Sequence, residues 1–123
     1  MKRFFLLTLA SAALLGASAA PVKTYEVKSP DGRLALVLTA GERLSFTVAR
    51  DGETLVAPSE MALTLSTGEV LGESPRVRSA RRRAVTETID APLYRQSRFD
   101  AAYNELDLRL RGDYGILARA YDD

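Results

Sequence analysis

The sequence predicts an all-β protein with the architecture of an antiparallel β-sandwich. From Thr24 onward, apolar and polar residues alternate with the period of two that places every second side chain on one face of a strand. Turn sequences that contain glycine separate these alternating runs. Short strands at this spacing, joined by hairpins, are typical of a sandwich or a barrel.

The individual strands are the segments between those turns. Alternation is clearest where Leu106, Leu108 and Leu110 are separated by charged residues, which predicts a strand with one buried face. The expected strands are Tyr25 to Lys28, Arg33 to Thr39, Leu44 to Arg50, Glu53 to Val56, Met61 to Leu65, Arg76 to Ser79, Val85 to Ile89, Asn104 to Arg111 and Tyr114 to Tyr121. After the apolar amino-terminal segment no helix is expected, apart from a turn near Ser97 to Ala102.

The first 19 residues have the three regions of a secretory signal peptide. Lys2 and Arg3 give a basic start, an apolar run follows, and small residues around Ala17 and Ala19 provide the recognition site for a signal peptidase. Cleavage is expected between Ala19 and Ala20, with export to a bacterial periplasm or beyond. A membrane anchor is the weaker alternative, because it needs about 20 apolar residues.

Composition excludes several classes of function. Without residues 1–19 the chain has 15 basic and 16 acidic residues, so its net charge of about −1 gives no reason to expect nucleic acid or an anionic membrane as a partner. There is no cysteine, so neither a disulfide framework nor a lipid-anchoring cysteine is available. There is no histidine either, which excludes serine-histidine, cysteine-histidine and histidine-metal chemistry.

Carboxylates are the remaining candidates for catalysis. Two pairs, Glu87 with Asp90 and Glu105 with Asp107, are close enough in sequence to suggest the acid and base of a glycoside hydrolase. Glu105 and Asp107, however, share a polar strand face with Arg109, which is typical of an exposed strand whose charges pair with each other. We therefore predict no catalytic, cofactor-binding or metal-binding residue.

Two basic motifs have simple structural interpretations. An arginine cluster is expected to form a solvated strand face or a domain contact rather than a phosphate-binding surface. Its members are Arg76, Arg78, Arg81, Arg82 and Arg83. The tripeptide Arg111-Gly112-Asp113 could be an adhesion motif, but its position between two alternating runs favours a hairpin turn.

Four segments together resemble one family of proteins. They are Ser29 to Arg33, Asp51-Gly52, Arg76 to Arg95 and Tyr103 to Asp123. In combination they are similar to the amino-terminal domain of family 97 glycoside hydrolases, the secreted bacterial α-glucosidases and α-galactosidases. The resemblance covers the chain from about Thr24 to Asp123, and residues 20–123 are expected to be part of that domain.

The resemblance implies a role without catalysis. Members of the family begin with a β-super-sandwich similar to galactose mutarotases, continue into a (β/α)8 barrel that holds the active site, and end with a small β domain. Their strand matching Arg119 to Asp123 continues into further sandwich strands, so this chain is expected to be a fragment truncated before the barrel. Because the catalytic glutamates and the calcium ligands lie downstream, no residue here inherits those roles. The fragment is expected to buttress the barrel and shape carbohydrate access, and not to be an enzyme by itself.

Two alternatives remain open. One is a free-standing secreted sandwich that binds sugars or mediates adhesion. Such a module needs aromatic side chains to stack against a sugar, and this chain supplies few: it has five tyrosines and four phenylalanines, and it has no tryptophan. The other is a purely structural or nonfunctional gene remnant. The sequence leaves open the sugar specificity and stereochemistry of the parent enzyme and the oligomeric state.

Overall fold

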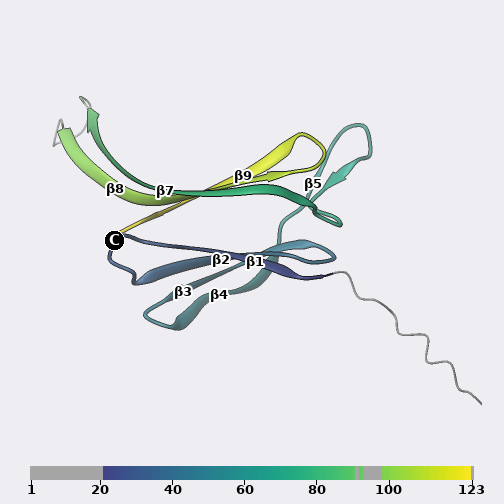
Figure 1. The fold of residues 1–123 in the computed structure, drawn as a ribbon, viewed down its shortest axis with the longest axis horizontal. Coiled ribbons are helices and arrows are strands. Elements are labelled where there is room, and N and C mark those ends of the chain that lie inside the picture. The colour runs from purple at the N-terminus through teal and green to yellow at the C-terminus, as the bar shows by residue number, and fades with distance from the viewer. Residues whose placement is uncertain (1–20, 91, 93–97, 123) are drawn as a thin grey trace, which may run out of the picture.

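The computed structural model describes residues 21–90, 92 and 98–122, which form β-strands joined by turns (Figure 1). The predicted signal peptide, with Ala17 and Ala19, lies outside the described residues. A four-stranded antiparallel sheet contains β1 (Lys23–Lys28), β2 (Leu34–Ala40), β3 (Leu44–Arg50) and β4 (Glu53–Glu60), in that order. A three-stranded antiparallel sheet contains β7 (Val77–Asp90), β8 (Arg98–Leu110) and β9 (Tyr114–Tyr121). A small hairpin of β5 (Leu63–Thr64) and β6 (Val70–Leu71) lies between them in sequence.

The two larger sheets pack face to face, which confirms the predicted all-β antiparallel sandwich (Figure 1). The core joins Val27 of β1 and Leu38 of β2 to side chains of the other sheet, namely Leu106, Leu108, Leu110 and Ala118. The alternating leucines of β8 therefore define its inner face, as the period of two predicted. Burying each such side chain contributes about 1.5–3 kcal/mol.

Hydrogen bonds join the two sheets at one side. The Nε of Arg82 donates to the carbonyl oxygen of Glu26 at 3.0 Å, and the Nδ2 of Asn104 donates to the carbonyl oxygen of Lys28 at 2.8 Å. Because Arg82 and Asn104 belong to β7 and β8, both bonds reach from the three-stranded sheet to β1. These two bonds hold the three-stranded sheet against β1 at this side of the sandwich.

The predicted turn at Arg111-Gly112-Asp113 is confirmed. Leu110 pairs with Tyr114, so the three residues between them form the loop. Gly112 has a φ of 95° and Asp113 a φ of 57°, and a three-residue hairpin loop commonly contains such a left-handed residue. The backbone N–H of Arg111 donates to the carbonyl oxygen of Arg76. The tripeptide thus joins β8 to β9 as a turn.

The structure corrects several strand boundaries. The segments predicted as separate strands at Arg76 to Ser79 and Val85 to Ile89 belong to one 14-residue strand, β7, and β8 begins at Arg98, where a helical turn was predicted. The reason is pairing: β7 pairs with β8 from Val77 opposite Leu110 to Asp90 opposite Arg98, with one shift of register between Val77 and Ser79. Cross-strand contacts of this kind override weak local propensity.

Smaller corrections concern the middle of the chain. β4 extends to Glu60 rather than ending at Val56, and it tolerates Pro58 because it is an edge strand. The strand predicted from Met61 to Leu65 is only the two-residue β5, and its partner β6 was not predicted.

The two sheets do not cover each other completely. β8 and β9 of the three-stranded sheet pack on β1 and β2 of the four-stranded sheet. The remaining strands of the four-stranded sheet, β3 and β4, extend past β9. Phe46 and Val48 lie opposite Leu38 and Leu36 and so share the inner face of the sheet, but both are only half-buried. We call this half-covered apolar surface of β3 and β4, next to β9, the β9 step.

Candidate functional site

The outer face of the three-stranded sheet carries the most elaborate polar arrangement among the described residues. We define the outer face as the side of β7, β8 and β9 that points away from the core. In its central row, Glu105 of β8 lies opposite Arg83 of β7 and Arg119 of β9. The row on one side holds Val85, Tyr103 and Tyr121, and the row on the other side holds Arg81, Asp107 and Leu117.

Glu105 is held between two arginines. The Nε of Arg83 donates to Oε1 of Glu105 at 2.5 Å, and the Nε of Arg119 donates to Oε2 at 2.9 Å. Although it lies on the outer face, Glu105 is only 4% exposed. The prediction that Glu105 is an exposed strand residue is therefore wrong, because the neighbouring side chains cover it.

These contacts decide the protonation state of Glu105. The hydrogen bond from Arg83 lowers its pKa most, and the bond from Arg119 adds to this effect against the opposing effect of burial. Glu105 raises the pKa of both guanidinium groups in return. A carboxylate with a lowered pKa is ionised at neutral pH and cannot donate a proton to a leaving group, so Glu105 is not suited to be a general acid.

Two tyrosines flank this arrangement. The Tyr103 side chain is 2% exposed, and its ring centroid lies 4.8 Å from that of Tyr121. The guanidinium carbon of Arg119 lies 4.9 Å from the centroid of the Tyr103 ring, within the range of a cation–π contact. Burial raises the pKa of the Tyr103 hydroxyl. The sequence analysis missed this cluster, because its members come from two strands and are brought together only by pairing.

The other candidate carboxylates are exposed or paired. Asp107 lies 2.9 Å from the Nε of Arg109, and Asp90 lies 2.9 Å from the Nε of Arg98. Glu87 is exposed and lies opposite Ala101. Neither predicted pair therefore lines an enclosed cavity; the hollow next to Glu105 and Asp107, of about 390 Å³, is otherwise lined by arginines alone.

Metal and membrane sites can be assessed for the same residues. In residues 21–90, 92 and 98–122, no group of three or more acidic side chains is placed to hold a metal ion. Within the same ranges no helix is long and apolar enough to span a membrane.

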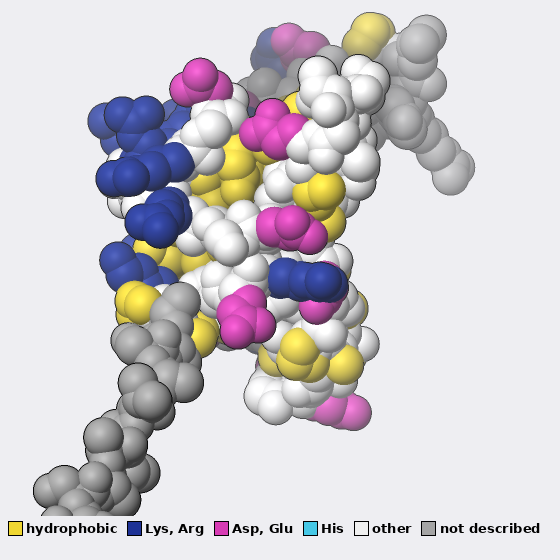
Figure 2. Space-filling view, turned by 90° about the vertical axis from the view of Figure 1, so that its right-hand side faces the viewer, with side chains coloured by type: hydrophobic (Ala, Val, Ile, Leu, Met, Phe, Trp, Pro, Cys, Tyr) yellow, Lys and Arg dark blue, Asp and Glu magenta, His cyan; other side chains and the backbone are white. Residues whose placement is uncertain are grey.

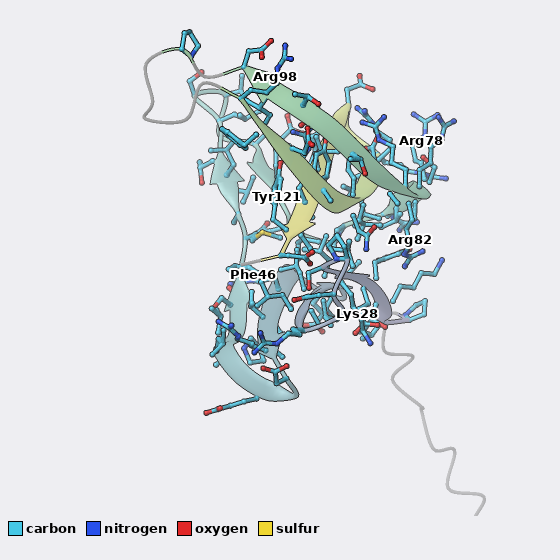
Figure 3. The ribbon with its side chains drawn as sticks, turned by 90° about the vertical axis from the view of Figure 1, so that its left-hand side faces the viewer. Lys28, Phe46, Arg78, Arg82, Arg98 and Tyr121 are labelled. Carbon is cyan, nitrogen blue, oxygen red and sulfur yellow. The ribbon has the colours of Figure 1, made fainter. Side chains whose placement is uncertain are left out.

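The arginine cluster divides between two roles. All five members are exposed. Arg82 and Arg83 make the specific contacts described above, whereas Arg76 lies just before β7 and Arg78 and Arg81 lie along it. Figure 2 shows basic side chains in a column along one side of the molecule, and Figure 3 places Arg78, Arg82 and Lys28 on that same side. β7 forms an edge of its sheet, so this column lies along a sheet edge.

A second polar contact joins the end of β9 to the first hairpin. The backbone N–H of Asp31 donates to Oδ1 of Asp122 at 2.8 Å, across 91 residues of sequence. Asp31 also accepts a hydrogen bond from the buried Ser29 hydroxyl, which lowers the pKa of its carboxyl. The contact holds the carboxyl-terminal part of β9 against the turn between β1 and β2.

The chain is similar to known proteins in both sequence and fold. The profile of the family described as Glycosyl-hydrolase 97 N-terminal matches residues 27–123. A retaining alpha-galactosidase of Bacteroides thetaiotaomicron is 37% identical over 101 residues, which are 82% of this chain and 15% of that enzyme.

Two solved structures share the fold. They are glycoside hydrolase family 97 enzymes from a Pseudoalteromonas species, one in complex with acarbose (TM-score 0.73) and one in complex with panose (TM-score 0.72). Each is 15% identical to this chain, and the match covers 80% of this chain but 16% of the solved one. The chain thus spans about a sixth of the length of these relatives. The family profile and the shared fold show that this chain belongs to glycoside hydrolase family 97, as part of its N-terminal domain.

Proposed function

We propose that the sandwich supports the catalytic barrel of a secreted family 97 glycoside hydrolase and shapes carbohydrate access to it. The parent enzyme would be an α-glucosidase or α-galactosidase. One relative is named an alpha-galactosidase, and two solved relatives were obtained with acarbose and panose. Residues 1–19 would direct export to the periplasm or beyond, with Ala17 and Ala19 recognised by the signal peptidase.

The β9 step is the observation that carries this proposal. β9 is an edge strand of the three-stranded sheet. It lies next to the part of β3 and β4 that this sheet leaves half-covered. Where β9 begins, an apolar hollow of about 280 Å³ lies between this strand and the hairpin of β5 and β6, lined by Leu44, Met61, Leu63, Leu71, Tyr114 and Ile116 among others. A sheet edge beside uncovered apolar surface is suited to receive another strand. We infer that further strands of the same polypeptide pair with β9 and cover the step.

Appending strands tests this inference. Residues 20–123 are compared with the same residues followed by the next sandwich segment of the Bacteroides alpha-galactosidase. We expect the extension to slow amide hydrogen exchange in β9 and to bury Phe46. A control extension in which proline replaces alternate residues cannot pair with β9 and should give no protection. Equal exchange with both extensions would refute the inference.

Export is tested separately by expression of the complete sequence in a Gram-negative host. Mass spectrometry of the exported product should give a chain that begins at Ala20. An intact amino terminus in the membrane fraction would instead support an anchor.

A further inference from the structure

The outer face combines buried polar side chains with exposed apolar ones, which a solvated sheet surface does not require. Figure 1 shows the hairpin of β7 and β8 bending away from the lower sheet toward its tip, so this face is concave. Tyr103 and Glu105 are buried on it, yet Leu117 is 54% exposed and Tyr121 is 40% exposed beside them. A surface with buried polar anchors and exposed apolar neighbours resembles the core of an interface more than a solvated face.

The charges on this face are not balanced. It carries one more basic than acidic side chain in these rows: Arg81, Arg83, Arg109 and Arg119 against Glu87, Glu105 and Asp107. Arg119 contacts Glu105 through Nε and also interacts with the Tyr121 side chain, whereas Arg83 contacts Glu105 through Nε and remains 64% exposed. A guanidinium held this way keeps its Nη groups for a second acceptor, and its planar fork suits a carboxylate.

We propose that the outer face docks on an acidic surface of the catalytic domain in the same polypeptide, and this rests on the proposed function. Carboxylate side chains of that domain accept hydrogen bonds from Arg83, while Leu117 and Tyr121 pack against apolar side chains beside it. Glu105 positions the two arginines before docking. The relatives provide the partner, because about five-sixths of their length lies outside the region matched here.

Cysteine labelling in a chimera tests the docking. The chain has no cysteine, so single substitutions can be introduced cleanly. The matched region of the Bacteroides alpha-galactosidase is replaced by this chain, with one of three probes: Leu117→Cys on β9, Ser79→Cys on the outer face of β7, or Leu55→Cys on β4. Leu55 is 56% exposed and is the matched control for Leu117 at 54%. Alkylation rates of folded protein are read by peptide mass spectrometry.

Docking should slow alkylation at both positions 79 and 117 by at least about tenfold relative to position 55. Protection of position 117 alone would mean that only a strand added at β9 covers the surface, and would overturn the proposal. Equal rates at all three positions would also overturn it. The α-galactosidase activity of the chimera without a probe reports on the proposed function independently, since a family domain should support it whichever face docks.

A charge variant tests the chemistry of the partner. Arg83→Gln in the chimera should restore part of the labelling at position 79, because a carboxylate of the partner loses its donor. Arg78→Gln, which removes an exposed arginine from the edge of the same strand, should leave labelling unchanged. If both variants leave the protection intact, the partner surface is not held by Arg83 and an acidic partner is excluded.

Discussion

The two edges of the three-stranded sheet differ in their chemistry. β7 carries four arginines in positions 78–83, and Arg82 also bonds to the backbone of β1. β9, from Tyr114 to Tyr121, has Arg119 as its one charged residue, and that side chain is committed to Glu105. Charged residues along an edge prevent another strand from pairing there, whereas an uncharged edge permits it. The same sheet thus has one protected edge and one that is ready to be extended.

The central strand β8 supports both edges, so a core truncation there should have the largest effect. Leu106 is fully buried, and Leu106→Ala should lower the free energy of unfolding by about 2–5 kcal/mol through lost burial and a cavity. Urea denaturation measures this. Leu55→Ala, at an exposed position, should change it by less than about 0.5 kcal/mol. Similar effects for both variants would contradict the described core.

The open edge predicts self-association of residues 20–123 alone. Without a strand beside β9, we expect this segment to be oligomeric or partly unfolded at concentrations where the extended form is monomeric. Leu117→Lys should shift it toward the monomer in size-exclusion chromatography, because a charge on the edge strand opposes pairing between copies. Ser79→Lys on the already basic β7 should not. A monomeric peak with a sharp cooperative melt for the unmodified segment would show that β9 is stable as an edge strand and needs no further strand beside it.

The buried Glu105 predicts a pH dependence of stability. Its pKa lies below the ordinary value of 4.5 in the folded chain, mainly through the hydrogen bond from Arg83. A carboxyl of this kind stabilises the fold above its unfolded pKa, and the contribution is lost as the pH falls through the folded pKa. The free energy of unfolding should therefore be level above about pH 5 and fall below about pH 4.5.

Glu105→Gln should reduce stability at neutral pH and flatten the acid part of this profile, because Arg83 and Arg119 lose their carboxylate. Its effect should be smaller than that of Leu106→Ala. Glu87→Gln is the matched control, since Glu87 is exposed and faces Ala101 across the strand pair. If both variants have the same acid profile as the unmodified chain, the two ion pairs do not contribute to stability.

The smallest expected effect is in a hydrolysis assay, because neither edge of the three-stranded sheet provides a catalytic site. The purified chain should leave aryl α-glucosides and α-galactosides unchanged with or without calcium, because its candidate carboxylates are paired or exposed. Chromogenic assays measure this. Turnover that disappears in Glu105→Gln or Glu87→Gln would identify a real catalytic group.

Much of the fold could be predicted from local sequence. The alternation of Leu106, Leu108 and Leu110 identified the inner face of β8, and Gly112 with Asp113 identified the turn to β9. Both features depend on neighbouring residues, which is why a pattern in one segment was enough. The resemblance to family 97 was equally readable, because it depends on short segments of sequence.

The tertiary structure decided the rest. Arg83 and Arg119 lie 22 and 14 residues from Glu105, so only the pairing of three strands buries that carboxylate. β7 became one long strand because β8 pairs with all of it, although its local sequence suggested two. The β9 step depends on how many strands each sheet contains and how the sheets overlap. Such properties arise from contacts between distant segments, and alternation within a single strand carries no record of which strand lies beside it.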